Sequence, residues 1–241
     1  LPTPTVNAIS SQTVCSGSAA SAINFTGGVS NTSYSWANNL GSIGLAASGT
    51  GNIPSFLTTN AGTTTLVATL TVSPTYTPGG FACAGNPQQF SITVKPTPTG
   101  NATPTATTLC SGQGHTISLG SSIPGSTYAW NVVLISGSVG ATGPFSGTSS
   151  VITNTFSGNA VFTQTIVASY NDCQSPVFSS SVTLNPLPTV SSSASNPVIC
   201  LGNSTTLSGS GTASSYTWTG GVTNGVAFSP TVTATYTVTG T

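Results

Sequence analysis

Alternation of polar and apolar residues dominates this chain. The segments Thr65–Val72, Val161–Ala168 and Thr231–Val238 place Thr at most positions of one parity and mainly Val, Ile, Leu, Phe or Tyr at the other. A period of two is typical of a β-strand with one face buried. Clusters of Gly, Asn and Pro interrupt these runs about every ten residues, and no helical period of 3.6 appears. The pattern predicts an all-β fold of immunoglobulin-like sandwiches.

A pair of short motifs recurs three times along the chain. A Cys-x-Gly motif is followed by a Tyr-x-Trp motif, and the two run from Cys15 to Trp36, from Cys110 to Trp130 and from Cys200 to Trp218. The first cysteines are 95 (110 − 15) and 90 (200 − 110) residues apart. A repeat of this length indicates tandem domains rather than a solenoid of short repeats.

The repeat divides the chain into three predicted domains, here named units 1, 2 and 3. Unit 1 covers residues 1–94 with an N-terminal linker at 1–5, unit 2 covers 95–185 with its linker, and unit 3 covers 186–241 with its linker. Unit 3 ends before a second cysteine and a final strand, so we expect a truncated sandwich with an open edge. Two explanations stay open: excision from a longer array, or completion by a strand from a neighbour, with Leu1–Val6 as the candidate donor.

Pro-x-Pro segments separate the units. Lys95–Thr99 and Asn185–Thr189 each follow an alternating strand, at Phe90–Val94 and Ser181–Leu184. Proline cannot continue a central strand and stiffens a connection towards polyproline II. The domains are therefore expected to be joined head to tail by short, semi-rigid linkers, as in a stalk.

Five cysteines occupy matching places in the repeats, which favours disulfides and an extracellular setting. The predicted pairs are Cys15–Cys83 and Cys110–Cys173, one in each full unit, with Cys200 unpaired or intermolecular. Each bridge would stabilise its domain by about 2–4 kcal/mol. Buried free thiols are the alternative. No CxxC motif or His cluster points to a metal site, and no cofactor is expected.

The tryptophans keep a nearly fixed distance from the first cysteine of each unit. Trp36, Trp130 and Trp218 are therefore interpreted as core residues, with an exposed row that stacks on sugars as the alternative.

Charge is almost absent from the chain. Lys95, Asp172 and His115 are its one cation, one anion and one histidine, whereas 39 Ser and 44 Thr residues supply the polarity. Nucleic-acid binding, calcium sites and carboxylate-based acid–base catalysis each need more charged groups than this. An uncharged surface lacks the repulsion that keeps copies apart, so self-association is expected.

His115 and Asp172 of unit 2 have a catalytic and a structural interpretation. A Ser–His–Asp triad is formally possible in unit 2, but no nucleophile-elbow motif accompanies His115 and Asp172, and units 1 and 3 lack both residues. They are interpreted as surface turn residues, and the chain as non-catalytic.

Several motifs together resemble those of a known family. The Cys-Ser-Gly starts, the Tyr-x-Trp strands, the Asn171–Cys173 turn, the Thr233–Gly240 ending and the Pro-x-Pro-Thr linkers are similar to the PKD-like, immunoglobulin-like tandem domains of Bacteroidota cell-surface adhesins. Such adhesins include gliding-motility adhesins exported by type IX secretion. The resemblance implies a spacer or adhesive filament and brings no catalytic residues.

The primary hypothesis is a structural segment of a secreted filament or adhesin stalk at the cell surface. Its partners would be copies of itself or adjacent repeats of a longer chain, without nucleic acid or membrane insertion, since no apolar run of transmembrane length exists. The alternative is a module that binds a carbohydrate or a surface through Phe81, Phe145 or Phe228.

Overall fold

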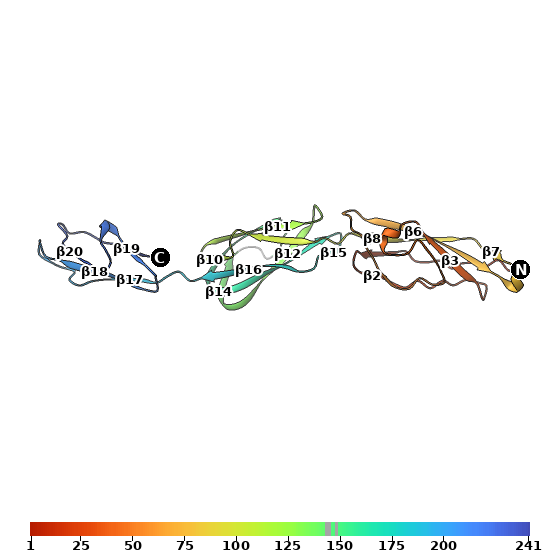
Figure 1. Ribbon diagram of the computed structural model, residues 1–241, viewed down its shortest axis with the longest axis horizontal. Coiled ribbons are helices and arrows are strands. Elements are labelled where there is room, and N and C mark those ends of the chain that lie inside the picture. Colours follow the sequence, from red (N-terminus) through yellow and green to blue (C-terminus); the bar gives the residue numbers. More distant parts are fainter. Residues whose placement is uncertain (143–145, 148) are drawn as a thin grey trace.

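Three β-sandwiches lie end to end in a row (Figure 1). The computed structural model describes residues 1–142, 146–147 and 149–241. Strands and three short 3-10 turns, η1 (Gly41–Ile43), η2 (Pro78–Gly80) and η3 (Thr219–Gly221), make up the regular structure of these residues. The predicted all-β class with tandem immunoglobulin-like sandwiches is confirmed.

Unit 1 builds its sandwich around one large sheet. The strand order is β1 (Gln12–Cys15), β8 (Gln88–Lys95), β6 (Leu66–Tyr76), β3 (Ser33–Asn38) and β4 (Ser48–Thr50), with β7 (Cys83–Ala84) paired to the end of β6. The opposing layer contains the short pair β2 (Ala19–Ala20) and β5 (Phe56–Leu57). One apolar cluster fills the space between the layers, and it includes Trp36, Leu70 and Phe90.

Unit 2 repeats the first three strands of this order and has longer strands. Its sheet runs β10 (Thr108–Cys110), β16 (Phe178–Asn185), β14 (Val151–Tyr170), β11 (Gly114–Ser121) and β9 (Gly100–Pro104), while β12 (Thr127–Thr142), β13 (Ser146–Gly147) and β15 (Cys173–Gln174) pair off this path. The first part of β14 pairs with β11 and its later part with β16. This one strand therefore contributes to both faces of the sandwich.

Unit 3 is built from shorter strands. One sheet holds β17 (Val190–Ala194), β18 (Thr205–Gly211) and β20 (Ala227–Phe228), and the other holds β19 (Tyr216–Trp218) and β21 (Val238–Gly240). Among the described residues, no strand of unit 3 corresponds to β8 or β16.

The tryptophans lie in the interior, and the N-terminal segment packs against unit 1. Trp36, Trp130 and Trp218 are 8%, 3% and 5% exposed. Val6 belongs to the core cluster of unit 1, and the Asn7 amide donates to the carbonyl of Thr26 at 2.8 Å. The segment considered above as a strand donor is thus packed on its own unit.

The Cys-x-Gly motif forms the same turn in every unit. The backbone N–H three residues after the cysteine donates to the cysteine carbonyl at 3.0, 3.1 and 3.0 Å in units 1, 2 and 3. The glycines Gly17, Gly112 and Gly202 have φ of 85°, 86° and 89°. A tight turn with a left-handed third residue requires glycine there, which explains the recurring motif.

Candidate functional site

The joint between units 1 and 2 holds the disulfide of this structure. Cys15, at the end of β1, is bonded to Cys173 on β15, with the two Cα atoms 5.6 Å apart. Cys83, Cys110 and Cys200 are free thiols. The bridge therefore links two domains, and the expected pairs Cys15–Cys83 and Cys110–Cys173 within the domains are wrong.

Strand direction explains this difference. Cys15 lies opposite Lys95 beside the start of β6, where Leu66 pairs with Val94, whereas Cys83 lies opposite Tyr76 at the end of β6. The ten residue steps between these ends span about 33 Å. A disulfide needs Cα atoms within about 7 Å of each other.

Unit 2 separates its cysteines in the same way. Cys110 lies opposite Asn185, next to the Leu184–Ala160 pair, and Cys173 lies opposite Tyr170 at the end of β14. Each full unit consequently carries one cysteine at each end.

An ion pair stands beside the bridge. The Lys95 Nζ donates to Asp172 Oδ2 and to the Asn171 carbonyl, each at 3.1 Å. The single cation of the chain thus meets its single anion across the joint. Because the Asp172 side chain is 93% exposed, this pair adds orientation and little free energy.

The turn that presents Asp172 and Cys173 has a specific backbone. Asn171 and Asp172 have φ of 47° and 67°, and they connect β14 to β15 through a two-residue hairpin. Two successive left-handed residues are typical of a type I′ hairpin, for which Asn and Asp are well suited.

The linker of this first joint is packed between the units. Pro96 and Pro98 are buried. The Thr97 hydroxyl donates to the Ser16 carbonyl at 2.7 Å, and the Thr99 amide donates to the Ser122 hydroxyl at 2.9 Å. Hydrogen bonds to both sides, a disulfide and an ion pair therefore hold units 1 and 2 together.

The linker of the second joint is exposed to solvent. Pro186, Leu187 and Pro188 are all exposed. Thr189 donates to Thr212 of unit 3 at 2.9 Å, much as Thr99 does in the first joint. Leu187 stands in the position of Thr97 and carries no hydroxyl. In the part of the chain that is described, no disulfide or ion pair crosses this joint.

The candidate catalytic residues of unit 2 are not brought together. His115 is 1% exposed, on β11 opposite Asn154, whereas Asp172 lies at the exposed end of the unit. The interpretation of His115 as a surface turn residue is wrong. Burial lowers the pKa of its imidazole, and both ring nitrogens lack a hydrogen-bond partner.

His115 belongs to a polar layer that the sequence analysis missed. Asn154 faces it across the strands, and Gln164 faces Ser180. All four residues are buried, and none of their side-chain nitrogen and oxygen atoms has a hydrogen-bond partner. Along β14 they separate one apolar cluster, with Ile152 and Ile166, from a second with Phe156 and Phe162.

Unit 1 has apolar residues in the equivalent layer. Gly17 donates to the Thr58 carbonyl and Gly112 to the Phe156 carbonyl, so Phe56 takes the place of Asn154. By the same repeat, Leu70 and Phe90, which are opposite each other, replace Gln164 and Ser180. The alternation of Gly114–Leu119, with His115 in phase with Ile117 and Leu119, is the sequence feature that could have revealed the buried histidine.

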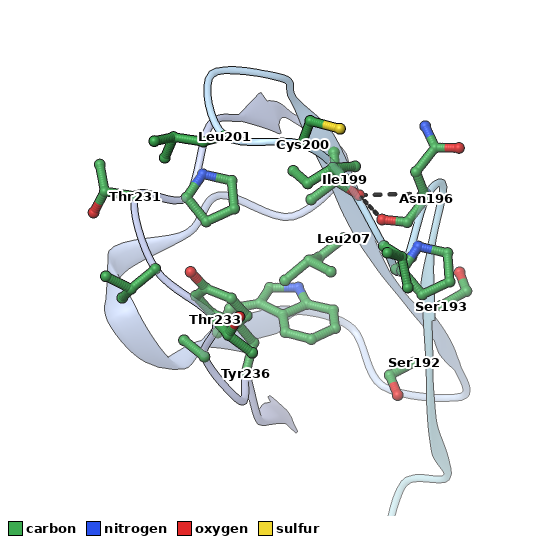
Figure 2. Close-up of a pocket in the computed structure, with 18 residues that line it drawn as sticks. Ser192, Ser193, Asn196, Ile199, Cys200, Leu201, Leu207, Thr231, Thr233 and Tyr236 are labelled. Carbon is green, nitrogen blue, oxygen red and sulfur yellow. Dashed lines mark hydrogen bonds between the residues drawn. The ribbon is translucent and has the colours of Figure 1, made fainter.

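Unit 3 contains an open groove of about 720 Å³ (Figure 2). One wall is the segment 196–201 with Ile199 and Cys200, the other is 230–234, and Leu207, Trp218 and Tyr236 line the space between them. In units 1 and 2 the strands β8 and β16 lie between the equivalent segments. The groove therefore occupies the place of that strand.

The aromatic residues proposed for ligand binding are scattered. Phe81 is 73% exposed at the outer end of unit 1. Phe228 packs against Tyr236 with ring centroids 5.2 Å apart. Phe145 lies outside the described residues. Within those residues, no three His, Cys, Asp or Glu side chains gather as a metal site, and no helix is long and apolar enough to cross a membrane.

Solved structures similar to this chain are multidomain ectodomains and adhesins. The eight N-terminal immunoglobulin domains of Down syndrome cell adhesion molecule align with 13% identity over 90% of this chain and 29% of that chain, at a TM-score of 0.47. The adhesin FdeC of Escherichia coli aligns with 15% identity over 72% and 60%, at 0.32. Human CDH23 EC21–23 aligns with 12% identity over 95% and 90%, at 0.40.

A family model matches part of the chain. No curated protein matches it. Residues 12–98, which make up most of unit 1 and reach into the first linker, match the family model of the PKD-like domain.

Proposed function

We propose that this chain is a non-catalytic structural segment of a secreted filament or adhesin stalk, in which units 1 and 2 act as one disulfide-stabilised spacer. The observation that carries this proposal is the Cys15–Cys173 bridge across the joint. A bridge placed between domains fixes their relative orientation, and a row of domains held in this way keeps its length. That property serves a spacer.

The surface composition supports the same role. One Lys and one Asp already contact each other at the joint, so the polar groups on the rest of the surface are hydroxyls and amides. Such a surface offers no electrostatic attraction for a charged ligand. The disulfide and the PKD-like match of residues 12–98 are consistent with an extracellular location.

Small-angle X-ray scattering on the full chain tests the spacer function. The Cys15→Ser/Cys173→Ser variant should show a broader distribution of overall dimensions than the wild-type chain, because the first joint is then free to bend. The Cys110→Ser variant, which changes a free thiol, is the control and should match wild type. Identical scattering from all three proteins would argue against a spacer that depends on this bridge.

The unit 3 groove favours a second candidate function, binding of a carbohydrate. Tyr236 lines it, and an aromatic ring can stack on a sugar face. Glycan-array binding that is lost in Tyr236→Ala and kept in Phe81→Ala would support this function. Absence of binding to any glycan would leave the groove as the place of a strand.

A further inference from the structure

The five cysteines fall into two structural classes. Turn cysteines begin the Cys-x-Gly turn at the C-terminal end of each unit: Cys15, Cys110 and Cys200. Hairpin cysteines lie opposite a tyrosine at the N-terminal end, Cys83 opposite Tyr76 and Cys173 opposite Tyr170. The bridge of the first joint joins the turn cysteine of one unit to the hairpin cysteine of the next.

The two outer ends of the row carry one free cysteine of each class. Cys83 is half-buried on β7, close to the N-terminus at one end (Figure 1). Cys200 is exposed and precedes β18, whose first residues pair with β20 at the opposite end of the row (Figure 1). Cys110 is exposed and lies opposite Asn185, at the start of the second linker. The outer ends therefore present the two halves of a joint like the one already formed.

Exposed apolar residues stand near both of these thiols. In the formed joint, Ser16 follows Cys15, and Asp172 precedes Cys173. At the outer ends Leu201 follows Cys200 and is 82% exposed, while Phe81, two residues before Cys83, is 73% exposed. Val198 next to this turn is 89% exposed.

After the turn cysteine, an exposed leucine thus stands where the formed joint has Ser16, and near the hairpin cysteine Phe81 is exposed. Large exposed apolar side chains that lie together indicate an interaction site, and Val198 and Leu201 flank the same turn.

We propose that a second copy of this chain docks its Cys200 end onto the Cys83 end of the first, with Leu201 and Val198 against Phe81, and that a Cys200–Cys83 disulfide closes the joint. The proposal rests on the spacer function and specifies its partner. The contacting surfaces are different ends of the molecule, so the contact is head to tail and does not close on itself. Contacts of this kind generate open filaments.

The bond forms by thiol–disulfide exchange with a low-molecular-weight disulfide such as oxidised glutathione. One cysteine thiolate attacks the small disulfide and releases one thiol, and the second cysteine thiolate then attacks the mixed disulfide and releases another. The two cysteines lose two electrons and two protons in total, and the small disulfide becomes two thiols.

Non-reducing electrophoresis of the full chain in a glutathione redox buffer tests the proposal. The wild-type chain should form a ladder of covalent multimers that reductant collapses to monomer. Cys83→Ser and Cys200→Ser should each abolish the ladder, and an equimolar mixture of the two variants should form dimers alone, since each then offers one competent end. The matched control Cys110→Ser should form the wild-type ladder, and Phe81→Ser should form it several-fold more slowly.

Peptic digestion and mass spectrometry of the multimers should find Cys83 joined to Cys200. A ladder that persists in Cys83→Ser, a ladder lost in Cys110→Ser, or wild-type multimers joined through Cys200–Cys200 would overturn the proposal. Absence of multimers would overturn it as well. None of these results touches the spacer function, because that function depends on Cys15–Cys173 within one chain.

Discussion

Single residues decide how the core of unit 2 differs from that of unit 1. Gln164 places an amide without a partner in the middle of the sandwich, where unit 1 has Leu70. A buried polar group that has lost its water and found no partner is destabilising by about 1–3 kcal/mol. The layer around it therefore lowers the stability of unit 2.

Replacement of this amide should stabilise the protein. We expect Gln164→Leu to raise the free energy of unfolding of unit 2 by about 1–3 kcal/mol, because the change removes an unsatisfied group at nearly constant volume. Urea unfolding measures this change in the free energy of unfolding. Gln174→Leu, at an exposed position of β15, is the control and should change stability by less than about 0.5 kcal/mol. A loss of stability in Gln164→Leu would show that the amide has partners in solution.

His115 should make unit 2 sensitive to mild acid. Burial holds the pKa of its imidazole below the ordinary value of 6.5, so the unfolded chain binds a proton at a higher pH than the folded chain does. The stability of unit 2 is therefore full above about pH 6.5 and falls as the pH drops below it. His115 is the one histidine of this chain.

Thermal unfolding between pH 7.5 and 5 measures this effect. The wild-type chain should lose stability across that range, while His115→Leu should stay nearly constant. Equal pH dependence in both proteins would contradict the assignment to His115.

The glycine of the Cys-x-Gly turn gives a third prediction at this scale. Gly112 has φ of 86° with no atom within 4 Å of an added Cβ, so Gly112→Ala tests backbone conformation alone. We expect a loss of about 1–2 kcal/mol in the stability of unit 2. Gly114→Ala, equally open but without a positive φ, is the matched control and should lose clearly less. Equal losses would mean that the turn does not require glycine.

At the scale of the elements, strand direction decides which cysteines can meet. The alternating pattern and the linkers predict the strands and joints well, because periodicity and proline act locally. The disulfide could not be predicted in the same way. Spacings of 68 (83 − 15) and 63 (173 − 110) residues suggest one bridge per unit. The parallel pairing of β1 with β8, however, carries Cys15 to the end away from Cys83.

The sequence also identifies only part of the core. The nearly fixed distance from Cys to Trp in each unit correctly identifies the buried tryptophans. His115 and Gln164 follow the apolar parity of their strands but are polar, and polarity favoured an exposed position. In the packed sandwich both lie inside, as the parity of their strands indicates and their polarity does not.

A bridge at the ends of domains has a different effect from one inside a domain. The Cys15→Ser/Cys173→Ser variant should keep the unfolding temperatures of units 1 and 2 close to wild type, because each core is closed by its own strands. Bridges within the units would instead contribute about 2–4 kcal/mol each. Differential scanning calorimetry distinguishes these outcomes, and a fall of both transitions by several degrees would contradict the assigned position of the bridge.

At the scale of the whole molecule, the joints differ in stiffness. Buried prolines, the Thr97–Ser16 hydrogen bond and the bridge hold the first joint, whereas the second has an exposed linker. Nitrogen-15 relaxation should therefore give units 1 and 2 one rotational correlation time and unit 3 a shorter one. Reductant should separate the values of units 1 and 2. Three independent values before reduction would contradict a rigid first joint.

Peptide mapping of the unreduced protein shows whether the disulfide joins the two domains. Trypsin is unsuitable for a chain with one Lys and no Arg, so pepsin at low pH, which also suppresses disulfide exchange, is the appropriate protease. Mass spectrometry should find the peptide with Cys15 joined to the peptide with Cys173. Recovery of Cys15 with Cys83 and of Cys110 with Cys173 would contradict the account.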